Sequence, residues 1–466
     1  MKNIKYIFLI SAVLFCSANI FAQSAMTELT FYKKQSQGED KKLLESIDNQ
    51  LGAWLDKNYA LPGADDALLL KASIEVRTKK YPAAYITLLR QKYEFPNSAN
   101  AQQAASLMNT VIENMPKSTR ENLKKAYALK SVPKNSDDRM AEFLASATKL
   151  EIKGSYEPLN DEYRSFFARF PTYENKDKME LMLGDLERFN KNYQAAVMQY
   201  KKVYDIYPST KYKAASLRML GDIYASELRD YNQAAYYYNS VIKNFPNSIE
   251  IATTYNHMAI MNDNQRDYVS AAENITKAAE IYLKNGQREK AYDAFLYKAQ
   301  LQEKKLKNYA GAVDTLNKTA QIFAKDEDKY INCKFLAADV YARRLKDNYG
   351  ELKSYEDIIS AYPASKQTPK ALYEAGMTAE KLDQYQKAKD LYQKLIINHP
   401  ADDYALKAQR RMSRVEKQLG TDDRTAAYGA PKGQTQKAAQ PQKQAKDPDQ
   451  NIENEEDEYD IIEELN

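Results

Sequence analysis

The chain has 466 residues, of which 44% are hydrophobic and 28% are charged, and its formal net charge is +4. Only two residues are cysteines, Cys16 and Cys333. Because Cys16 falls in an N-terminal segment that we expect to be removed, a fold held by intramolecular disulfides is excluded. The basic residues are interleaved with acidic ones along the chain, which argues against a surface for nucleic acid.

Residues 1–22 have the layout of a secretory signal peptide. Two lysines lie within the first five residues, an apolar run follows over 6–15, and Ala22 precedes the expected cleavage before Gln23. The alternative is an N-terminal membrane anchor, but the run is shorter than the ~20 residues of a span. A lipoprotein would need a small residue before its cysteine, whereas Phe15 precedes Cys16. We therefore expect an exported protein without a stable transmembrane span.

A hydrophobic and aromatic pattern then returns about every 37 to 38 residues. The clearest copies run from a tyrosine to a proline: Tyr193 to Pro208, Tyr231 to Pro246 and Tyr385 to Pro400. The same frame fits Tyr81 to Pro96, Tyr156 to Pro171 and, one residue shorter, Tyr349 to Pro363, while weaker copies begin at Tyr268 and Tyr309. A period of this length indicates stacked structural repeats, since one unit cannot bury its apolar face alone.

Each copy predicts the second helix of a helical pair. Tyr385, Ala388, Tyr392 and Leu395 follow the i, i+3, i+7 spacing of an amphipathic helix. The proline cannot continue the helix and pushes the preceding residue toward an extended conformation. We expect a preceding helix that carries a small residue for close packing, such as Gly184, Gly221 or Gly376, opposite Ala196, Ala234 or Ala388. No segment is typical of a strand, so the expected fold class is all-α.

The positions of four residues resemble a known signature. Gly184, Ala196, Tyr200 and Pro208 are spaced as in the tetratricopeptide repeat family. The resemblance covers roughly residues 30–420 and implies a right-handed α-solenoid of about 9–10 helix pairs whose first helices line a groove for peptides or partner proteins. The Y/F-P-x-S repeat ends are similar to those of exported Gram-negative envelope proteins of this family. Such proteins are not usually enzymes.

The register predicts which residues line that groove. Counted from the small residue of each first helix, the exposed positions are Asp185, Arg188, Arg218, Asp222, Asn256, Asp263, Tyr373 and Lys381. This mixed polar set suits a protein partner. The clamp with which co-chaperone repeats hold a C-terminal carboxylate needs Lys and Asn four residues apart, and here Arg218 pairs with Asp222 instead.

Catalytic and cofactor motifs are missing from the sequence. His257 and His399 have no second ligand at a suitable spacing, and neither a Walker loop nor a nucleophile elbow is present. Cys333 lies in an apolar helical stretch, which favours a packed thiol over a nucleophile. We expect no catalytic residue, metal or cofactor.

Tyrosine is in excess, at 37 residues, whereas Trp54 is the single tryptophan. Most tyrosines fall at core positions of the repeat, although at least one of Tyr236, Tyr237 and Tyr238 must face outward. Exposed tyrosines leave open a second function, the binding of glycan or peptidoglycan.

The C-terminal end changes character. Residues 421–446 read as a flexible linker, and 447–466 form an acidic tail with ten acidic residues and no basic ones. Without those ten, the first 446 residues carry +14. The tail could serve solubility, fold back on the basic body, or present a binding motif formed by Tyr459, Ile461, Ile462 and Leu465.

The sequence thus predicts five regions: a signal peptide (1–22), an N-terminal helical region (23–64), a repeat solenoid (65–420), a linker (421–446) and a disordered acidic tail (447–466). The expected function is a non-catalytic protein-interaction scaffold in the periplasm or at the outer membrane, where it would serve the assembly of outer-membrane or division complexes. The alternative is a glycan- or peptidoglycan-associated binding protein. In either case the partner's identity is not encoded in the repeats.

Overall fold

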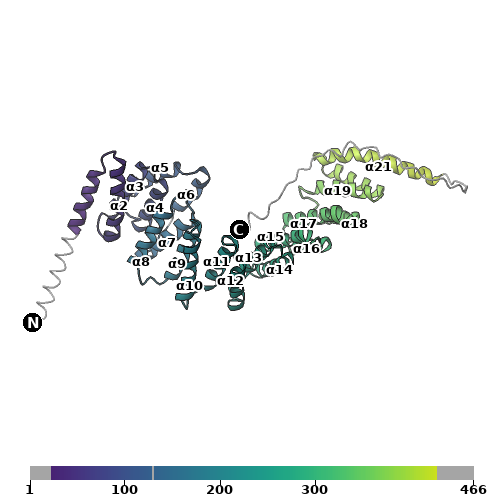
Figure 1. Cartoon of the computed structure of the whole chain (residues 1–466). Coiled ribbons are helices and arrows are strands. Elements are labelled where there is room, and N and C mark those ends of the chain that lie inside the picture. Colours follow the sequence, from purple (N-terminus) through teal and green to yellow (C-terminus); the bar gives the residue numbers. More distant parts are fainter. Residues whose placement is uncertain (1–21, 129–130, 428–466) are drawn as a thin grey trace, which may run out of the picture. The chain divides into compact units, whose positions relative to one another are not determined.

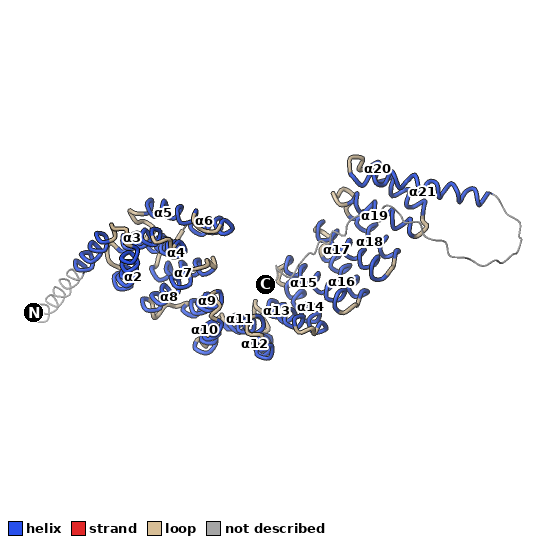
Figure 2. The backbone as a smooth tube through the Cα atoms, turned by 45° about the horizontal axis from the view of Figure 1, so that its top comes forward, coloured by secondary structure: helices blue, strands red, loops and turns tan. Residues whose placement is uncertain are grey.

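The computed structural model describes residues 22–128 and 131–427, with side chains up to 420. Every regular element of these residues is a helix, and none is a strand (Figures 1 and 2). The expected all-α repeat fold is confirmed. The predicted signal peptide, apart from Ala22, and the predicted acidic tail with its candidate motif lie outside the described residues.

The chain divides into two compact units, 1–240 and 241–466, and the boundary falls within one helix, α12. The helices up to this boundary follow one that covers residues 22–35. They are α2 (Lys41–Asn58), α3 (Ala64–Arg77), α4 (Tyr81–Glu94), α5 (Ala101–Glu113), η1 (Lys117–Thr119), α6 (Arg120–Tyr127), α7 (Ser136–Lys149), α8 (Tyr156–Arg169), α9 (Lys176–Phe189), α10 (Tyr193–Ile206), α11 (Lys213–Ser226) and α12 (Tyr231–Asn244).

The second unit continues the pairs and adds two short π-helices, η2 and η3. Its elements are α13 (Ile251–Asn264), α14 (Tyr268–Lys284), α15 (Arg288–Gln300), η2 (Leu301–Lys305), α16 (Tyr309–Ile322), α17 (Glu327–Val340), η3 (Tyr341–Leu345), α18 (Asn348–Ala361), α19 (Thr368–Lys381), α20 (Tyr385–Asn398) and α21 (Asp403–Ala427). Within the second unit, each helix from α13 to α21 packs on the next helix along the chain. The short connections make neighbouring helices antiparallel.

The repeat frame sets the ends of the second helices. Seven of them begin at the repeat tyrosine, and six end two residues before a proline, as α10 does at Ile206 before Pro208. The proline ring leaves no room for another helical turn. In the copy that starts at Tyr268 the proline is missing, and α14 runs for 17 residues instead of 14. The copy that starts at Tyr309 also lacks the proline, but α16 still has 14 residues, so the proline is one of several ways in which these helices end.

Glycines of the first helices contact tyrosine rings of the second. A Cβ atom on Gly184 would clash with Tyr200, and the same holds for Gly376 with Tyr392. The sequence places an alanine opposite each glycine. In the structure Ala196 is fully buried, but the atoms nearest to Gly184 belong to the tyrosine one turn further along the helix. The ring packs against bare backbone, which brings the paired helices close together.

One repeat departs from the frame. After Pro96 comes α5, but the second helix of that pair, α6, has only 8 residues. It ends well before Pro133, the proline expected at this step. Its single buried residue is Leu123. The pair therefore offers a shorter packing face than its neighbours.

The N-terminal region has a core of its own. Trp54 is 2% exposed and donates a hydrogen bond of 3.0 Å from Nε1 to the carbonyl oxygen of Ala25, which ties the helix 22–35 to α2. At the other end, the backbone of α21 stays helical to Ala427, beyond the expected boundary at residue 420. None of the described helices combines the length and the apolar character needed to cross a membrane.

Candidate functional site

The eight predicted groove residues are divided between the two units. Asp185, Arg188, Arg218 and Asp222 lie on α9 and α11, whereas Asn256, Asp263, Tyr373 and Lys381 lie on α13 and α19. Arg188 and Lys381 are exposed, and most of the others are half-buried. Their role in binding remains a prediction, but the structure shows that several of them already have partners within the chain.

Carboxylates of the first helices accept hydrogen bonds from repeat tyrosines. The hydroxyl of Tyr200 donates to Asp185 at 2.7 Å, and that of Tyr238 donates to Asp222 at 2.8 Å. Asp222 also pairs with Arg218. Burial raises the pKa of Asp185, although the hydrogen bond from Tyr200 works in the opposite direction. These polar residues therefore help to hold the helix pairs together.

Predicted groove residues of the second unit also have partners within the chain. Asp263 accepts a hydrogen bond of 2.7 Å from Tyr297, and the ammonium of Lys381 lies 3.2 Å from Glu351. The ring of Tyr373 lies against Tyr392 and Tyr404, with centroid separations of 6.1 and 5.4 Å.

Asn256 is not exposed as expected. Its side chain is buried, with 4% of the residue accessible. The reason is its spacing: Asn256 lies three residues before Ala259, so both share the face of α13 that packs inside. The predicted exposure of Asn256 is therefore wrong.

A cavity in the first unit lies apart from the predicted groove residues. It has a volume of about 630 Å³ and lies among α2, α3, α4 and α8. Its apolar wall comes mainly from α4, through Pro82, Ala83 and Ile86, and from Pro158 of α8. Gly52 of α2 also lines the cavity, and a Cβ atom there would meet no atom within 4 Å. We call this cavity the α2–α8 pocket.

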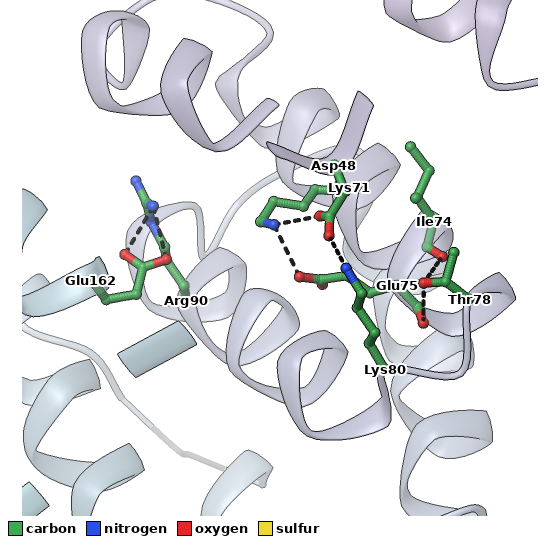
Figure 3. A network of polar contacts seen from close by, with 8 residues as sticks. All are labelled: Asp48, Lys71, Ile74, Glu75, Thr78, Lys80, Arg90 and Glu162. Atoms are coloured by element: carbon green, nitrogen blue, oxygen red, sulfur yellow. Dashed lines mark hydrogen bonds and ion pairs between the residues drawn. The ribbon is translucent and has the colours of Figure 1, made fainter. Parts of the chain in front are cut away.

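Charged side chains form one part of the pocket wall (Figure 3). The ammonium of Lys71 lies between two carboxylates, 2.5 Å from Oδ1 of Asp48 and 3.0 Å from Oε1 of Glu75. Lys80 reaches the other oxygen of Asp48 at 3.0 Å. Asp48 and Glu75 are almost fully buried, at 4% and 1% exposure. The two lysines balance the two carboxylates at this end of the pocket.

A second ionic group contains Arg90, which is 3% exposed. Its guanidinium binds both oxygens of Glu162 at 2.9 and 3.0 Å and Oε2 of Glu94 at 2.6 Å, and Glu94 also contacts Arg169. Glu162 comes from α8, 72 residues further along the chain. The group therefore joins α4 to α8 beneath the pocket.

The environment shifts the pKa of these carboxyl groups in opposite directions. Burial raises the pKa of Glu75 to about 7, because the attraction of Lys71 is opposed by the nearby carboxylate of Asp48. Burial would also raise the pKa of Glu94, but Arg90 and Arg169 outweigh it and hold the pKa below its ordinary value. Burial also raises the pKa of Glu162, so Glu75 and Glu162 both hold a proton more tightly than an ordinary carboxyl group does.

Two polar atoms of the wall lack a hydrogen-bond partner in the described part of the chain. They are Oε2 of Glu75, an acceptor when ionised, and Nη2 of Arg90, a donor. Burying such atoms without partners costs free energy. Both atoms are closed off from solvent, so a ligand in the pocket would instead meet the accessible charged groups of the lining, such as Lys80 and Asp161.

None of the pocket residues follows from sequence reasoning. Lys71 with Glu75 and Arg90 with Glu94 are four residues apart, which is also the spacing of ordinary ion pairs on a solvated helix. The sequence contains no signal that Glu162 covers Arg90. Among the described residues, no group of three or more His, Cys, Asp or Glu side chains could hold a metal ion together.

Comparisons with known proteins identify part of the chain. The tetratricopeptide repeat model matches residues 215–248 and 370–402, which correspond mostly to α11 with α12 and to α19 with α20. No curated protein sequence is significantly similar.

Several solved structures are similar at low sequence identity. A tetratricopeptide repeat protein from Parabacteroides merdae is 15% identical over 59% of this chain and 98% of its own, with a TM-score of 0.32. A Rap protein in complex with competence and sporulation factor is 14% identical over 86% and 99%, with a TM-score of 0.32. For PilF of Pseudomonas aeruginosa the identity is 15%, the coverages 51% and 98%, and the TM-score 0.29.

Proposed function

We propose that this chain, which contains tetratricopeptide repeats, is a non-catalytic scaffold that binds a peptide segment of a partner protein in the α2–α8 pocket. The observation that carries the proposal is the pocket wall. It places apolar side chains beside charged groups, of which Lys80 and Asp161 keep accessible side chains.

A peptide has the chemistry that this wall would complement. Each peptide group carries one N–H donor and one C=O acceptor. The ammonium of Lys80 can donate to the C=O group, and the carboxylate of Asp161 can accept from the N–H group, since both residues line the pocket and keep accessible side chains. The volume of about 630 Å³ is within the range of pockets that hold small ligands, and it would admit a few residues of a peptide. Pro82, Ile86 and Pro158 would contact its apolar side chains.

The proposed location is the cell envelope, either the periplasm or the periplasmic face of the outer membrane. Support comes from the signal-peptide layout of residues 1–22 and from the Y/F-P-x-S repeat ends. The assemblies served there would be outer-membrane or division complexes.

Exposed tyrosines favour a second candidate function, the binding of glycan or peptidoglycan. The ring of Tyr236 is 64% exposed and that of Tyr349 is 66% exposed, whereas Tyr237 and Tyr238 are buried. Exposed tyrosine rings can stack on sugars. These two residues are far from the α2–α8 pocket in sequence, so the two functions can be tested separately.

The experiment is crosslinking in cells followed by affinity capture of the mature protein, which starts at Gln23. Gly52→Phe should fill the pocket without displacing other side chains, because the glycine faces open space. Gly38→Phe is the matched control, since Gly38 also faces open space but lies outside the pocket. We expect the control variant to capture a defined set of envelope proteins. The Gly52→Phe variant should no longer capture that set.

Peptides from a captured protein should then bind the purified mature protein, and Gly52→Phe should weaken that binding at least ~10-fold, as expected for a blocked pocket. Capture that is insensitive to Gly52→Phe would exclude the pocket as the peptide site. Recovery of peptidoglycan or polysaccharide without protein would overturn the scaffold proposal and make Tyr236 and Tyr349 the residues to mutate.

A further inference from the structure

The turns between first and second helices share an unusual backbone feature. Residues with side chains occupy the left-handed conformation at these turns, and most of them are basic. In the second unit they are Arg266, Lys307 and Lys346, with φ of 64°, 55° and 56°. This conformation normally favours glycine, which the chain uses at Gly286, in a turn of the other kind. A basic side chain therefore stands where glycine would be less strained.

Two of these turns directly follow the π-helices. η2 ends with Lys304 and Lys305, and η3 contains Arg343 and Arg344. π-helical turns are rare and often occur at functional sites. We define the basic edge of the second unit by the seven cations at these turns: Arg266, Lys304, Lys305, Lys307, Arg343, Arg344 and Lys346. All seven are exposed.

Side-chain contacts show that the three turns are neighbours. Nε of Arg344 in η3 lies 2.9 Å from Oε1 of Glu303 in η2. The ammonium of Lys305 lies 5.6 Å from the ring centre of Tyr268, which is two residues after Arg266. The cations thus form one continuous surface.

Acidic residues at the same edge already have partners. Glu303 pairs with Arg344, and Asp339 pairs with Arg343 at 2.6 Å. Asp347 caps α18 by accepting hydrogen bonds from two backbone N–H groups, and Asp267 caps α14. By contrast, Arg266, Lys304, Lys307 and Lys346 form no ion pair with any residue of the described part of the chain. The edge therefore has a surplus of positive charge.

The basic edge also exposes apolar side chains. Val269 is 59% exposed, Tyr349 is 66% exposed and Leu345 is 38% exposed. They belong to the same three turns or to the first residues of the following helices. A partner for this surface should combine negative charge with apolar groups.

Residues 447–466 have that composition. Ten of these twenty residues are acidic, none is basic, and Tyr459, Ile461, Ile462 and Leu465 interrupt the acidic run. The chain also leaves the described region on the appropriate side. Because neighbouring helices alternate in direction, α21 runs parallel to α17 and α19, so its C-terminal end points toward the edge that carries these turns.

The connecting segment is long enough. Residues 428–446 number 19. A chain of 19 residues without regular structure would span about 24 Å on average and about 65 Å when fully extended. Helices α19 and α20 separate α21 from the turn at Lys346, and helices pack about 8–10 Å apart. The acidic segment can therefore reach the basic edge of its own chain.

We propose that residues 447–466 dock on the basic edge of the second unit within the same chain. Acidic side chains pair with Arg266, Lys304, Lys307 and Lys346, and the apolar residues of the segment cover Val269, Leu345 and Tyr349. The docked segment is an intramolecular occupant that an acidic partner would have to displace.

The test is carbodiimide crosslinking of the full mature chain, which joins lysines to carboxylates in direct contact, followed by mass spectrometry. Crosslinks should join residues 447–466 to Lys304, Lys307 or Lys346, and their yield should not depend on protein concentration. Higher salt should reduce the yield, because exposed charges are screened. Crosslinks that appear only between two molecules would overturn the proposal.

A binding measurement provides an independent test. A labelled peptide of residues 447–466 should bind a chain that ends at Lys446 at least ~10-fold more tightly than it binds the full chain, where the tethered segment competes at a high effective concentration. Equal binding to both chains would overturn the proposal.

Charge reversal shows whether position or overall charge matters. The triple variant Lys304→Glu, Lys307→Glu, Lys346→Glu should weaken binding of the peptide at least ~10-fold. The matched control is Lys284→Glu, Lys325→Glu, Lys366→Glu, three exposed lysines near the turns at the opposite helix ends. If the control variant weakens peptide binding equally, the effect depends on overall charge alone, and the assignment to the basic edge is wrong.

Discussion

The hydroxyl of Tyr200 donates a hydrogen bond of 2.7 Å to Oδ1 of Asp185, from the second helix of a repeat to the first. The ring of Tyr200 is fully buried against Gly184, the residue before Asp185. One side chain therefore supplies both the close packing of the pair and a polar contact that determines its register. Tyr238 makes the same two contacts with Gly221 and Asp222.

Gly184→Ala should destabilise the protein, because the new Cβ would clash with the buried ring of Tyr200. We expect a loss of about 1–3 kcal/mol in the free energy of unfolding, the usual cost of overpacking. Urea denaturation measures it. Gly52→Ala is the control, since that helical glycine faces open space. It should be neutral or stabilising by up to about 1 kcal/mol, and an equal loss in both variants would contradict the packing argument.

Arg90→Met should destabilise the protein strongly, because it leaves the buried carboxylates of Glu94 and Glu162 without their shared partner. Breaking a buried ion pair from one side costs about 3–5 kcal/mol. In Arg164→Met the lost pair, with Asp161, is exposed, so the expected change is below about 1 kcal/mol. Chemical denaturation of the two variants would show whether the difference exists.

Glu75→Gln should change the pH dependence of stability. Burial raises the pKa of Glu75 to about 7 in the folded state, from an ordinary value of 4.5. A raised pKa means that the folded state binds the proton more tightly, so this contribution is complete below pH 4.5 and is lost as the pH rises through 7. The amide of Glu75→Gln does not ionise, so the variant does not lose this stability as the pH rises.

The free energy of unfolding of Glu75→Gln, relative to the unmodified protein, should therefore increase between pH 4.5 and 7. The expected change is on the order of 2–3 kcal/mol. Urea denaturation across this pH range measures it, and Glu39→Gln, at an exposed site, controls for the loss of one negative charge. A difference that stays constant with pH would show that Glu75 does not titrate in this window.

Cys333 should not react with alkylating reagents in the folded protein. Its thiol is fully buried, and burial raises the pKa of the thiol to about 12, so the reactive thiolate is scarce at neutral pH. It is the one cysteine between Gln23 and Asn466. Labelling with iodoacetamide, followed by mass spectrometry, should be negligible in buffer and complete in urea. Rapid labelling of the folded protein would contradict the buried position.

Lys307→Gly should be neutral or stabilising by up to about 1 kcal/mol, because glycine adopts φ of 55° without the cost that a Cβ atom brings. Gly286→Lys, at φ of 73°, should lower the free energy of unfolding by a similar amount. Thermal unfolding of the two variants should therefore shift in opposite directions. Destabilisation by Lys307→Gly would mean that the lysine side chain makes contacts that stabilise the turn.

Local features of the fold could be predicted because they depend on neighbouring residues. Tyr193, Tyr231 and Tyr385 each begin a helix, and the prolines that follow bound those helices. Of the three consecutive tyrosines, the outward one is Tyr236. Backbone sterics and the 3.6-residue period act within a few residues of each position, so they can be read along the chain.

Features that depend on distant residues could not be predicted in this way. Asp185 has the sequence position of an exposed residue, yet Tyr200 partly covers it. The α2–α8 pocket needs Arg90 to meet Glu162, 72 residues away. The sequence places each charge on a helix, but it does not state which helix lies opposite.

The sequence by itself determined the repeat period, the helical pairs and their ends, because these follow from side-chain size, proline geometry and helical spacing. Only the tertiary structure decided which polar residues are buried together and which stay exposed. The physical reason is that ion pairs such as Lys71 with Asp48 form through space between helices. The burial that shifts the pKa of Glu75 arises only after those helices have packed.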